Sequence, residues 1–151
     1  MSGVFDLKIT GLNELLKELQ GLERKIFDKA MNKTVRAGAK VIQKAARENA
    51  PVRSNEWEGA NYPNPPGTLK KGIAIAKASR QPPTIVRYQV GFAPKAWYGH
   101  LVERGHKLVR AGKTIGHVPA HPFLRPAFDN NVQKVIEEMK TTLRGELDKL
   151  K

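Results

Sequence analysis

The chain has 151 residues, a length that suits one domain with its own hydrophobic core. It contains no cysteine, which excludes disulfides and thiolate metal sites, and it has no apolar run long enough to span a membrane. The N-terminus lacks the basic and then apolar pattern of a signal peptide, so we expect a soluble product that stays where it is made. The net charge of +13 predicts an acidic protein surface or nucleic acid as partner, or else a solvated basic surface.

The charges are distributed unevenly along the chain. Between Gly59 and Phe128 the only acidic residue is Glu103, whereas eleven lysines and arginines fall in the same stretch. The other acids lie towards the two ends of the chain. This distribution favours a basic face that meets acidic neighbours or nucleic acid.

The first residues predict a strand followed by a helix. Residues 4–10 alternate between apolar and polar side chains, which is the pattern of a half-buried strand, and Gly11 ends it. Leucines then recur at helical spacing across residues 12–22, which predicts a short amphipathic helix with a break or bend near Gly21.

Residues 23–49 carry the longest helical pattern, and Pro51 ends it. Its apolar stripe comprises Phe27, Met31, Val35, Gly38, Ile42 and Ala46. A basic row lies about 200° around the helix from this stripe, because most of its members precede a stripe position by two residues. The basic row comprises Lys25, Lys29, Lys33, Arg36, Lys40, Lys44 and Arg47. Like charges four residues apart cost about 0.2–0.5 kcal/mol per pair, so the row predicts either a solvated face or a contact with acidic protein or DNA phosphates.

The next part of the chain predicts a long loop and then a hairpin. Residues 52–68 are rich in Pro, Asn and Gly and predict a flexible loop, in which Trp57 lies over the core or against a partner. Residues 69–79 and 84–92 have the character of strands. Prolines between them predict a turn, and therefore an antiparallel hairpin on which the long helix can pack.

Two dense clusters follow, separated by a basic segment. Residues 97–105 predict a short helix that Gly105 ends. Residues 105–121 predict a second flexible loop, with Lys107, Arg110 and Lys113 among glycines. Such a loop is mobile, becomes ordered between subunits, or lines a channel for DNA, where its phosphate contacts would be non-specific and sensitive to salt.

Prolines in the second cluster fix the entry into a last helix. Pro119, Pro122 and Pro126 precede an apolar stripe that runs from Phe128 to Leu150. The acids of this helix could pair with the basic row, within one chain or between two. A small antiparallel sheet packed against a long helix, with a C-terminal helix, predicts a single α+β domain over residues 1–151.

Candidate chemistry is sparse. His117 and His121 have the spacing of a helical metal pair, but Pro119 separates them and no nearby acid completes a ligand set. A nuclease needs clustered carboxylates, and Glu103 stands alone. The tripeptide 112–114, Gly-Lys-Thr, lacks the earlier glycine of a phosphate-binding loop. We therefore expect no catalytic residue, no metal and no cofactor.

Glu103 has two structural interpretations. It forms an ion pair at a helix end, or it accepts hydrogen bonds from backbone N–H groups of a neighbouring loop. We favour a structural or inter-subunit contact over proton transfer.

The order of the motifs resembles a known family. Ala50-Pro51, Gly67-Thr68-Leu69 and Ile73-Ala74-Ile75 precede "WYGHLVERG" at 97–105 and "PAHPFLRPAF" at 119–128. This arrangement resembles the small tail-component proteins of long-tailed bacteriophages and prophages. Those proteins complete the tail, or join head and tail at the neck, as a ring.

The resemblance implies a structural virion protein, assembled in the bacterial host cytoplasm with other tail or connector proteins as partners. It implies a homo-oligomeric ring in the virion, with a monomer in isolation and passing DNA as a non-specific contact. The expected structural and interface residues are Trp97, Tyr98, Glu103, Gly105, Pro122, Phe123, Leu124, Arg125 and Pro126. A stand-alone, non-specific nucleic-acid-binding protein is the alternative.

Overall fold

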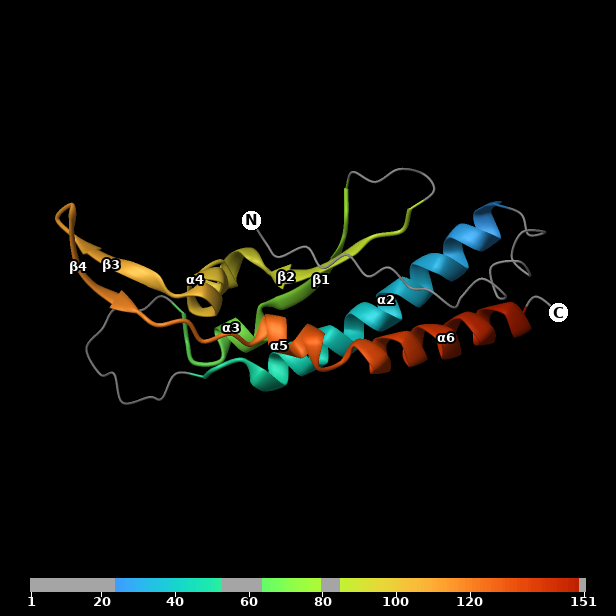
Figure 1. The fold of residues 1–151 in the computed structure, drawn as a ribbon. Coiled ribbons are helices and arrows are strands. Elements are labelled where there is room, and N and C mark those ends of the chain that lie inside the picture. The colour runs from blue at the N-terminus through green and yellow to red at the C-terminus, as the bar shows by residue number, and fades with distance from the viewer. Residues whose placement is uncertain (1–23, 53–63, 80–84, 150–151) are drawn as a thin grey trace.

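The computed structural model describes residues 24–52, 64–79 and 85–149, and the structural statements below concern these ranges. The strand and helix predicted for residues 4–22 lie outside them, as does most of the predicted loop 52–68. Two long helices lie side by side, a small sheet lies over one end of the pair, and a second two-stranded ribbon projects beyond the sheet (Figure 1). The predicted α+β class is confirmed.

Helix α2 (Arg24–Asn49) forms the spine of the molecule. Its most deeply buried side recurs at every fourth residue, at Ala30, Thr34, Gly38, Ile42 and Ala46. The second half of the predicted apolar stripe is therefore correct. In the first half the stripe is offset, because small residues at 30 and 34 are buried while Phe27, Met31 and Val35 are only half-buried.

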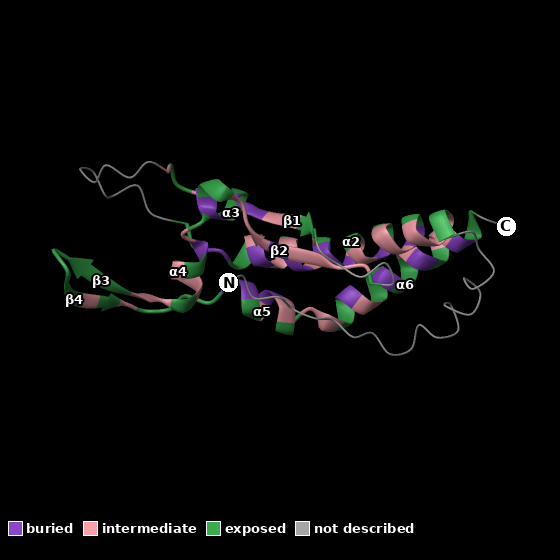
Figure 2. Ribbon diagram, turned by 90° about the horizontal axis from the view of Figure 1, so that it is seen from above, coloured by how far each residue is buried: buried purple, intermediate pink, exposed green. Residues whose placement is uncertain are grey.

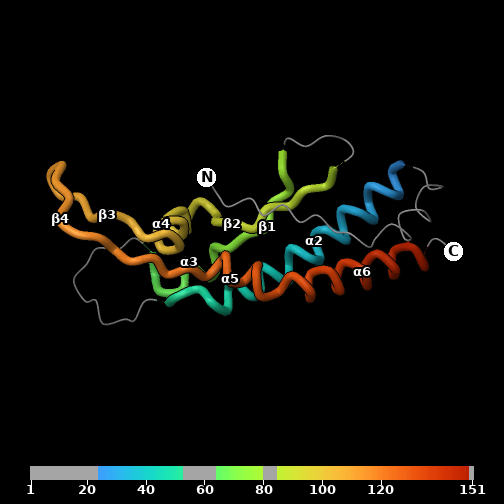
Figure 3. Tube along the Cα trace, viewed as in Figure 1, coloured from blue at the N-terminus to red at the C-terminus, as the bar shows by residue number. Residues whose placement is uncertain are grey.

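Small residues on α2 allow helix α6 (Val132–Asp148) to pack closely and antiparallel to it (Figure 3). A Cβ added at Gly38 would lie 2.9 Å from Met139 Cγ and 3.0 Å from Val135 Cγ1. The buried residues of α6 are Val135, Met139, Leu143 and Leu147, as predicted.

The predicted C-terminal helix is broken before its stripe is complete. Phe128 lies in a separate short helix, α5 (Leu124–Asp129), and α6 begins three residues later. Asn131 Nδ2 donates a hydrogen bond to the Ala127 carbonyl oxygen at 2.9 Å. Asparagine competes for backbone groups in this way and favours helix ends, which explains the break.

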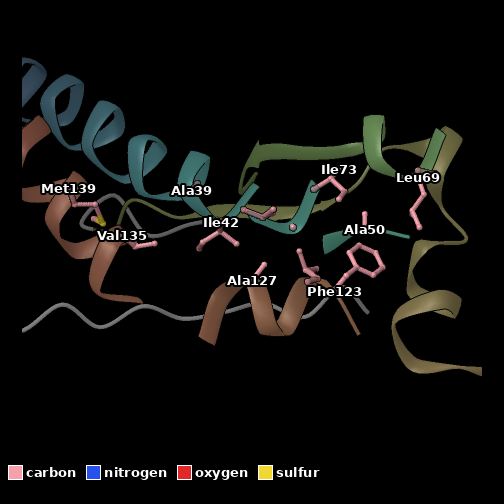
Figure 4. Close-up of a cluster of buried hydrophobic side chains, with 13 residues drawn as sticks. Ala39, Ile42, Ala50, Leu69, Ile73, Phe123, Ala127, Val135 and Met139 are labelled. Atoms are coloured by element: carbon pink, nitrogen blue, oxygen red, sulfur yellow. The ribbon is translucent and has the colours of Figure 1, made fainter. Parts of the chain in front are cut away.

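The predicted hairpin is confirmed, although both strands are shorter than expected. Strands β1 (Ile73–Lys77) and β2 (Tyr88–Phe92) pair antiparallel, with Ile73 opposite Phe92. Leu69 lies in a one-turn helix instead, α3 (Thr68–Lys71), so the strand begins only after Gly72. Both α2 and the sheet contribute to the core, which continues to Phe123 (Figure 4).

The second predicted loop is wrong: most of residues 105–121 form a β-ribbon. After the 3₁₀ turn η1 (Pro94–Ala96) and helix α4 (Gly99–Arg104), strand β3 (His106–Arg110) pairs antiparallel with β4 (Lys113–Val118). The connection is Ala111–Gly112, with φ values of 48° and 76°. Two positive φ angles define a type I′ turn, whose twist matches that of a hairpin.

Candidate assembly interface

Glu103, near the end of α4, holds the start of helix α5. Its Oε2 accepts hydrogen bonds from the backbone N–H groups of Phe123 at 2.8 Å and Leu124 at 2.9 Å, and its Oε1 accepts one from Arg125 at 3.0 Å. The first N–H groups of a helix have no partner within the helix. A carboxylate from another element satisfies them and complements the positive end of the helix dipole. The second of the two interpretations of Glu103 is therefore the observed one.

The same region closes the base of the β3–β4 ribbon. The His121 N–H donates to the Val102 carbonyl oxygen at 2.8 Å. Gly105 has φ +70°, and a Cβ there would lie 2.6 Å from the Val118 carbonyl oxygen and 2.8 Å from Ala120 N. Only glycine suits both the dihedral and the space. We call these contacts, with the three bonds to Glu103, the Glu103 clamp.

The proline-rich cluster divides between the core and the surface. Phe123 is 1% exposed, and its ring centroid lies 5.9 Å from that of Phe92. Leu124 is also buried. The exposed or half-buried members are Pro122, Arg125 and Pro126. The cluster therefore anchors the returning chain through its apolar members.

Trp97 lies at the rim of an apolar hollow. The hollow measures about 560 Å³ and is open to solvent. Trp97 is 60% exposed, and its ring meets that of Tyr98 edge-on, with centroids 6.5 Å apart. Residues from three parts of the chain line it, among them Val52, Pro65, Leu69, Trp97, Tyr98 and Leu101. Tyr98, Leu101 and Val102, at the start of α4 and within it, thus form one wall of this hollow.

The ribbon has no buried residue, whereas α2 and α6 are buried along their facing sides (Figure 2). Leu108 pairs with Gly116 and Val109 with Thr114, so Ile115 is an extra residue in a β-bulge. Val109 and Ile115 are each 63% exposed. The sequence analysis missed these two residues because the segment is basic. The signal for a ribbon was the two-residue turn Ala111–Gly112, with Val109 before it and Thr114 and Ile115 after it.

The basic row on α2 is exposed along most of its length. Lys25, Lys29, Arg36, Lys40 and Lys44 are exposed, as are Lys107, Arg110 and Lys113 of the ribbon. No ion pair is formed by these eight residues within the part of the chain that the structure describes.

Arg47 and Lys33, the other two members of the row, make contacts within the chain. Arg47 Nη2 donates to the Ile73 carbonyl oxygen at 2.8 Å, and so does Gln43 Nε2, which together fix β1 to α2. Lys33 forms an ion pair with Glu146 of α6 at 2.6 Å. The proposed pairing of the C-terminal acids with the basic row is thus observed within one chain, at this position.

Glu146 is held by two lysines. Lys149 Nζ lies 2.7 Å from Oε1, and Lys33 Nζ lies 2.6 Å from Oε2. These hydrogen bonds, that of Lys149 first, lower the pKa of Glu146 from 4.5 to about 2. The carboxylate therefore joins the C-terminal part of α6 to the N-terminal half of α2.

The geometry offers packing surfaces and charged rows instead of clustered reactive groups. Among residues 24–52, 64–79 and 85–149, no three His, Asp or Glu side chains are grouped as a metal site would require. His117 and His121 are both exposed, one in β4 and one beyond it. In the same ranges, no helix combines the length and the apolar character needed to cross a bilayer.

Comparison with known proteins assigns the family. Residues 13–105, more than half of the chain, match the family model described as "Bacteriophage HK97-gp10, putative tail-component". Searches of the curated proteins and of the solved structures found no match. The matched range includes the long helix, the first sheet and helix α4 with Glu103, and the chain belongs to the HK97-gp10-like family of bacteriophage tail components.

Proposed function

We propose that this tail component is a structural virion protein that completes the tail or joins it to the head, acting as one subunit of a ring. The observation that carries the proposal is the ribbon, which the Glu103 clamp closes at its base and which exposes Val109 and Ile115. A two-stranded ribbon is only marginally stable alone in water, and exposed apolar side chains gathered in one place mark interaction sites. An assembled virion supplies the surface that would cover them.

The two ends of the molecule offer different surfaces, which is what a ring requires. Closed rings are built from heterologous contacts, in which two unlike patches meet on each subunit. The ribbon projects at one end, and the paired helices α2 and α6 extend at the other (Figure 1). Other tail and connector proteins at the tail end or neck are the remaining partners under this proposal.

Glu103 supports an assembly role over catalysis. Both of its carboxylate oxygens are engaged by backbone N–H groups. The three bonds make this carboxylate the cap that fixes the start of α5, which is a structural role. Nearby, Gly105 allows the close approach of the backbone at the base of the ribbon, and Trp97 lines the hollow. Both roles are structural.

The test is deletion of the gene from the phage or prophage that encodes the chain, followed by complementation. We expect separate heads and tails, or tails with an unfinished end, in electron micrographs of the deletion lysate. The wild-type chain should restore joined, infectious particles and should be found in purified virions by mass spectrometry. A surface variant such as Thr141→Ser, exposed on α6, is the matched control and should restore them equally.

Two outcomes contradict the proposal. One is normal infectious particles in the absence of the chain. The other is complementation without any of the chain in purified virions, which would indicate a role outside the particle.

A further inference from the structure

We propose that the ribbon tip of one copy docks in the apolar hollow of the next copy, with Val109 and Ile115 inserted beside Trp97. This inference rests on the proposed ring and names the contact that would build it. The occupant of the hollow is thus a second copy of this chain.

The exposed apolar side chains are concentrated in these two places. Six large hydrophobic residues are exposed in the described ranges. Three of them are on the ribbon, namely Leu108, Val109 and Ile115, and two line the hollow, namely Val52 and Trp97. Among the described residues, neither place has the apolar cover that the other could provide.

Val109 and Ile115 lie close together near the tip of the ribbon, and both are exposed. Cross-strand partners in an antiparallel pair share a face, so Val109 and Thr114 lie on the same side. The register passes from Val109–Thr114 to Leu108–Gly116, so Ile115 is the unpaired residue of the bulge and directly follows Thr114. We call Val109 and Ile115, which lie close to the turn at Ala111–Gly112, the apolar group of the ribbon.

The ribbon and the hollow are arranged for a contact between copies. His106, at the base of the ribbon, lines the hollow, whereas the apolar group lies near the far end. Strand β3 places about 14 Å between His106 and Arg110, at a rise of about 3.4 Å per residue. The tip points away from the body, and so away from helices α3 and α4, whose residues line the hollow (Figure 1). A projection and a recess at separate points of one chain make a head-to-tail contact, which is the heterologous kind that closes rings.

The area of this contact sets its strength. A ribbon face about 20 Å long and 10 Å wide offers roughly 200 Å², estimated from the rise and spacing of strands. A stable interface buries about 800 Å² on each partner. The ribbon contact alone falls short of that value, so copies in solution should associate weakly and remain together only when other virion proteins align them.

Charge indicates how the weak contact responds to salt. The copies repel, because each carries a net charge of +13 and the ribbon itself bears Lys107, Arg110 and Lys113. None of the described residues that line the hollow carries a carboxylate. Salt screens repulsion between like charges and leaves apolar contacts intact, so association should increase with ionic strength. Docking on an acidic protein or on DNA would show the opposite dependence.

The chain has no cysteine, so cross-linking can be made specific to this contact. Thr114→Cys places a thiol beside the apolar group without removing it, and Val52→Cys places one at the rim of the hollow. The two variants are mixed at high protein concentration with a short bismaleimide, at low and high salt. Thr141→Cys, exposed on α6, replaces Thr114→Cys in the matched control.

We expect a Thr114→Cys/Val52→Cys heterodimer whose yield is several-fold above the control and rises with salt. Adding Val109→Ser and Ile115→Ser to the ribbon variant should reduce the yield to the control level. Thermal unfolding followed by circular dichroism shows that each variant remains folded.

The docking is overturned by a heterodimer yield equal to the control, by a yield that falls with salt, or by a ribbon-to-ribbon product as the main species. Virion analysis separates this failure from failure of the proposed function. If the cysteine variants enter infectious virions and still give no ribbon-to-rim product, the docking is wrong and the proposed function stands. If the wild-type chain is absent from virions, the proposed function fails whatever the solution result.

Discussion

Glu103 caps a helix from a different element. A capping side chain normally precedes the helix that it caps by one to three residues, whereas Glu103 lies 20 to 22 residues before the N–H groups that it accepts. The carboxylate therefore determines where the chain returns after the ribbon. Removing it would leave three adjacent backbone donors to find water at a site that is only partly open to solvent.

Glu103→Ala should lower the free energy of unfolding by about 2–4 kcal/mol. Hydrogen bonds to a charged group contribute about 1.5–3 kcal/mol each, and water recovers part of that here because the Arg125 end of the site is exposed. The free energy of unfolding of Glu103→Gln should lie between those of the wild type and Glu103→Ala. Its amide oxygen can still accept hydrogen bonds, whereas its NH₂ group is a donor that would face backbone N–H donors. Urea unfolding followed by circular dichroism measures the three values.

Glu138→Ala is the control for this series, because Glu138 is exposed on α6 and lies far along the chain from the clamp. Its free energy of unfolding should stay within about 0.5 kcal/mol of the wild type. A Glu103→Ala protein as stable as this control would show that the three hydrogen bonds do not hold α5 in place.

At the scale of elements, the helices with the longest periodic apolar patterns were predicted best. The pattern of α2 spans 26 residues, so many positions agree on one period and identify the helix. Only its buried side shifted, because close packing of α6 selects small residues such as Ala30 and Gly38, and the periodic pattern does not show which neighbour will lie closest. The β1–β2 hairpin was identified from alternation in the same way.

The ribbon escaped prediction because its two strands are basic and lie among glycines, a composition typical of a loop. Each has five or six residues, and the turn between them places Ala111 at a φ of 48°, a conformation usually taken by glycine or asparagine. The candidate site was predicted in part for the same reason. Glu103, Trp97 and Gly105 stood out as rare residue types in context, whereas Val109 and Ile115 acquire meaning only once both strands are placed.

The pairing of α2 with α6 carries a dependence on pH. Lys149 and Lys33 lower the folded-state pKa of Glu146 to about 2, below its ordinary value of 4.5. A lowered carboxyl pKa stabilises the folded state fully above the unfolded-state pKa, and this contribution is lost as the pH falls from about 4.5 towards 2. The stability difference between the wild type and Glu146→Gln should be constant near neutral pH and shrink across that window, measured by denaturant unfolding at several pH values.

The two lysines provide the control for that measurement. In a Lys33→Met/Lys149→Met background the partners that lower the pKa are absent, so Glu146→Gln should have a similar effect at every pH. A difference that still shrinks below pH 4.5 in this background would assign the pH dependence to other groups.

At the scale of the whole molecule, charge and shape serve different ends. The body is elongated, with the ribbon at one end and the N-terminal end of α2 and the C-terminal end of α6 at the other (Figure 3). The apolar group on the ribbon and the hollow suit contacts between proteins. The exposed basic row on the outer side of α2 suits either solvent or a polyanion, and its five open members follow the axis of a helix about 39 Å long, at 1.5 Å per residue.

That row decides between an assembly component and a stand-alone nucleic-acid-binding protein. Phosphate contacts lose affinity steeply with salt, and a few of them are too weak to persist near 0.15 M salt without apolar or base contacts. We expect the isolated chain to bind duplex DNA at low salt and to release it near physiological salt, as measured by fluorescence anisotropy. Lys40→Glu/Lys44→Glu should weaken the low-salt binding and flatten its salt dependence, whereas Lys140→Glu on α6, exposed but outside the row, should change it less. Tight binding that persists at physiological salt and is lost in Lys40→Glu/Lys44→Glu would place nucleic-acid binding ahead of ring assembly. A structural protein past which DNA moves does not require tight DNA binding.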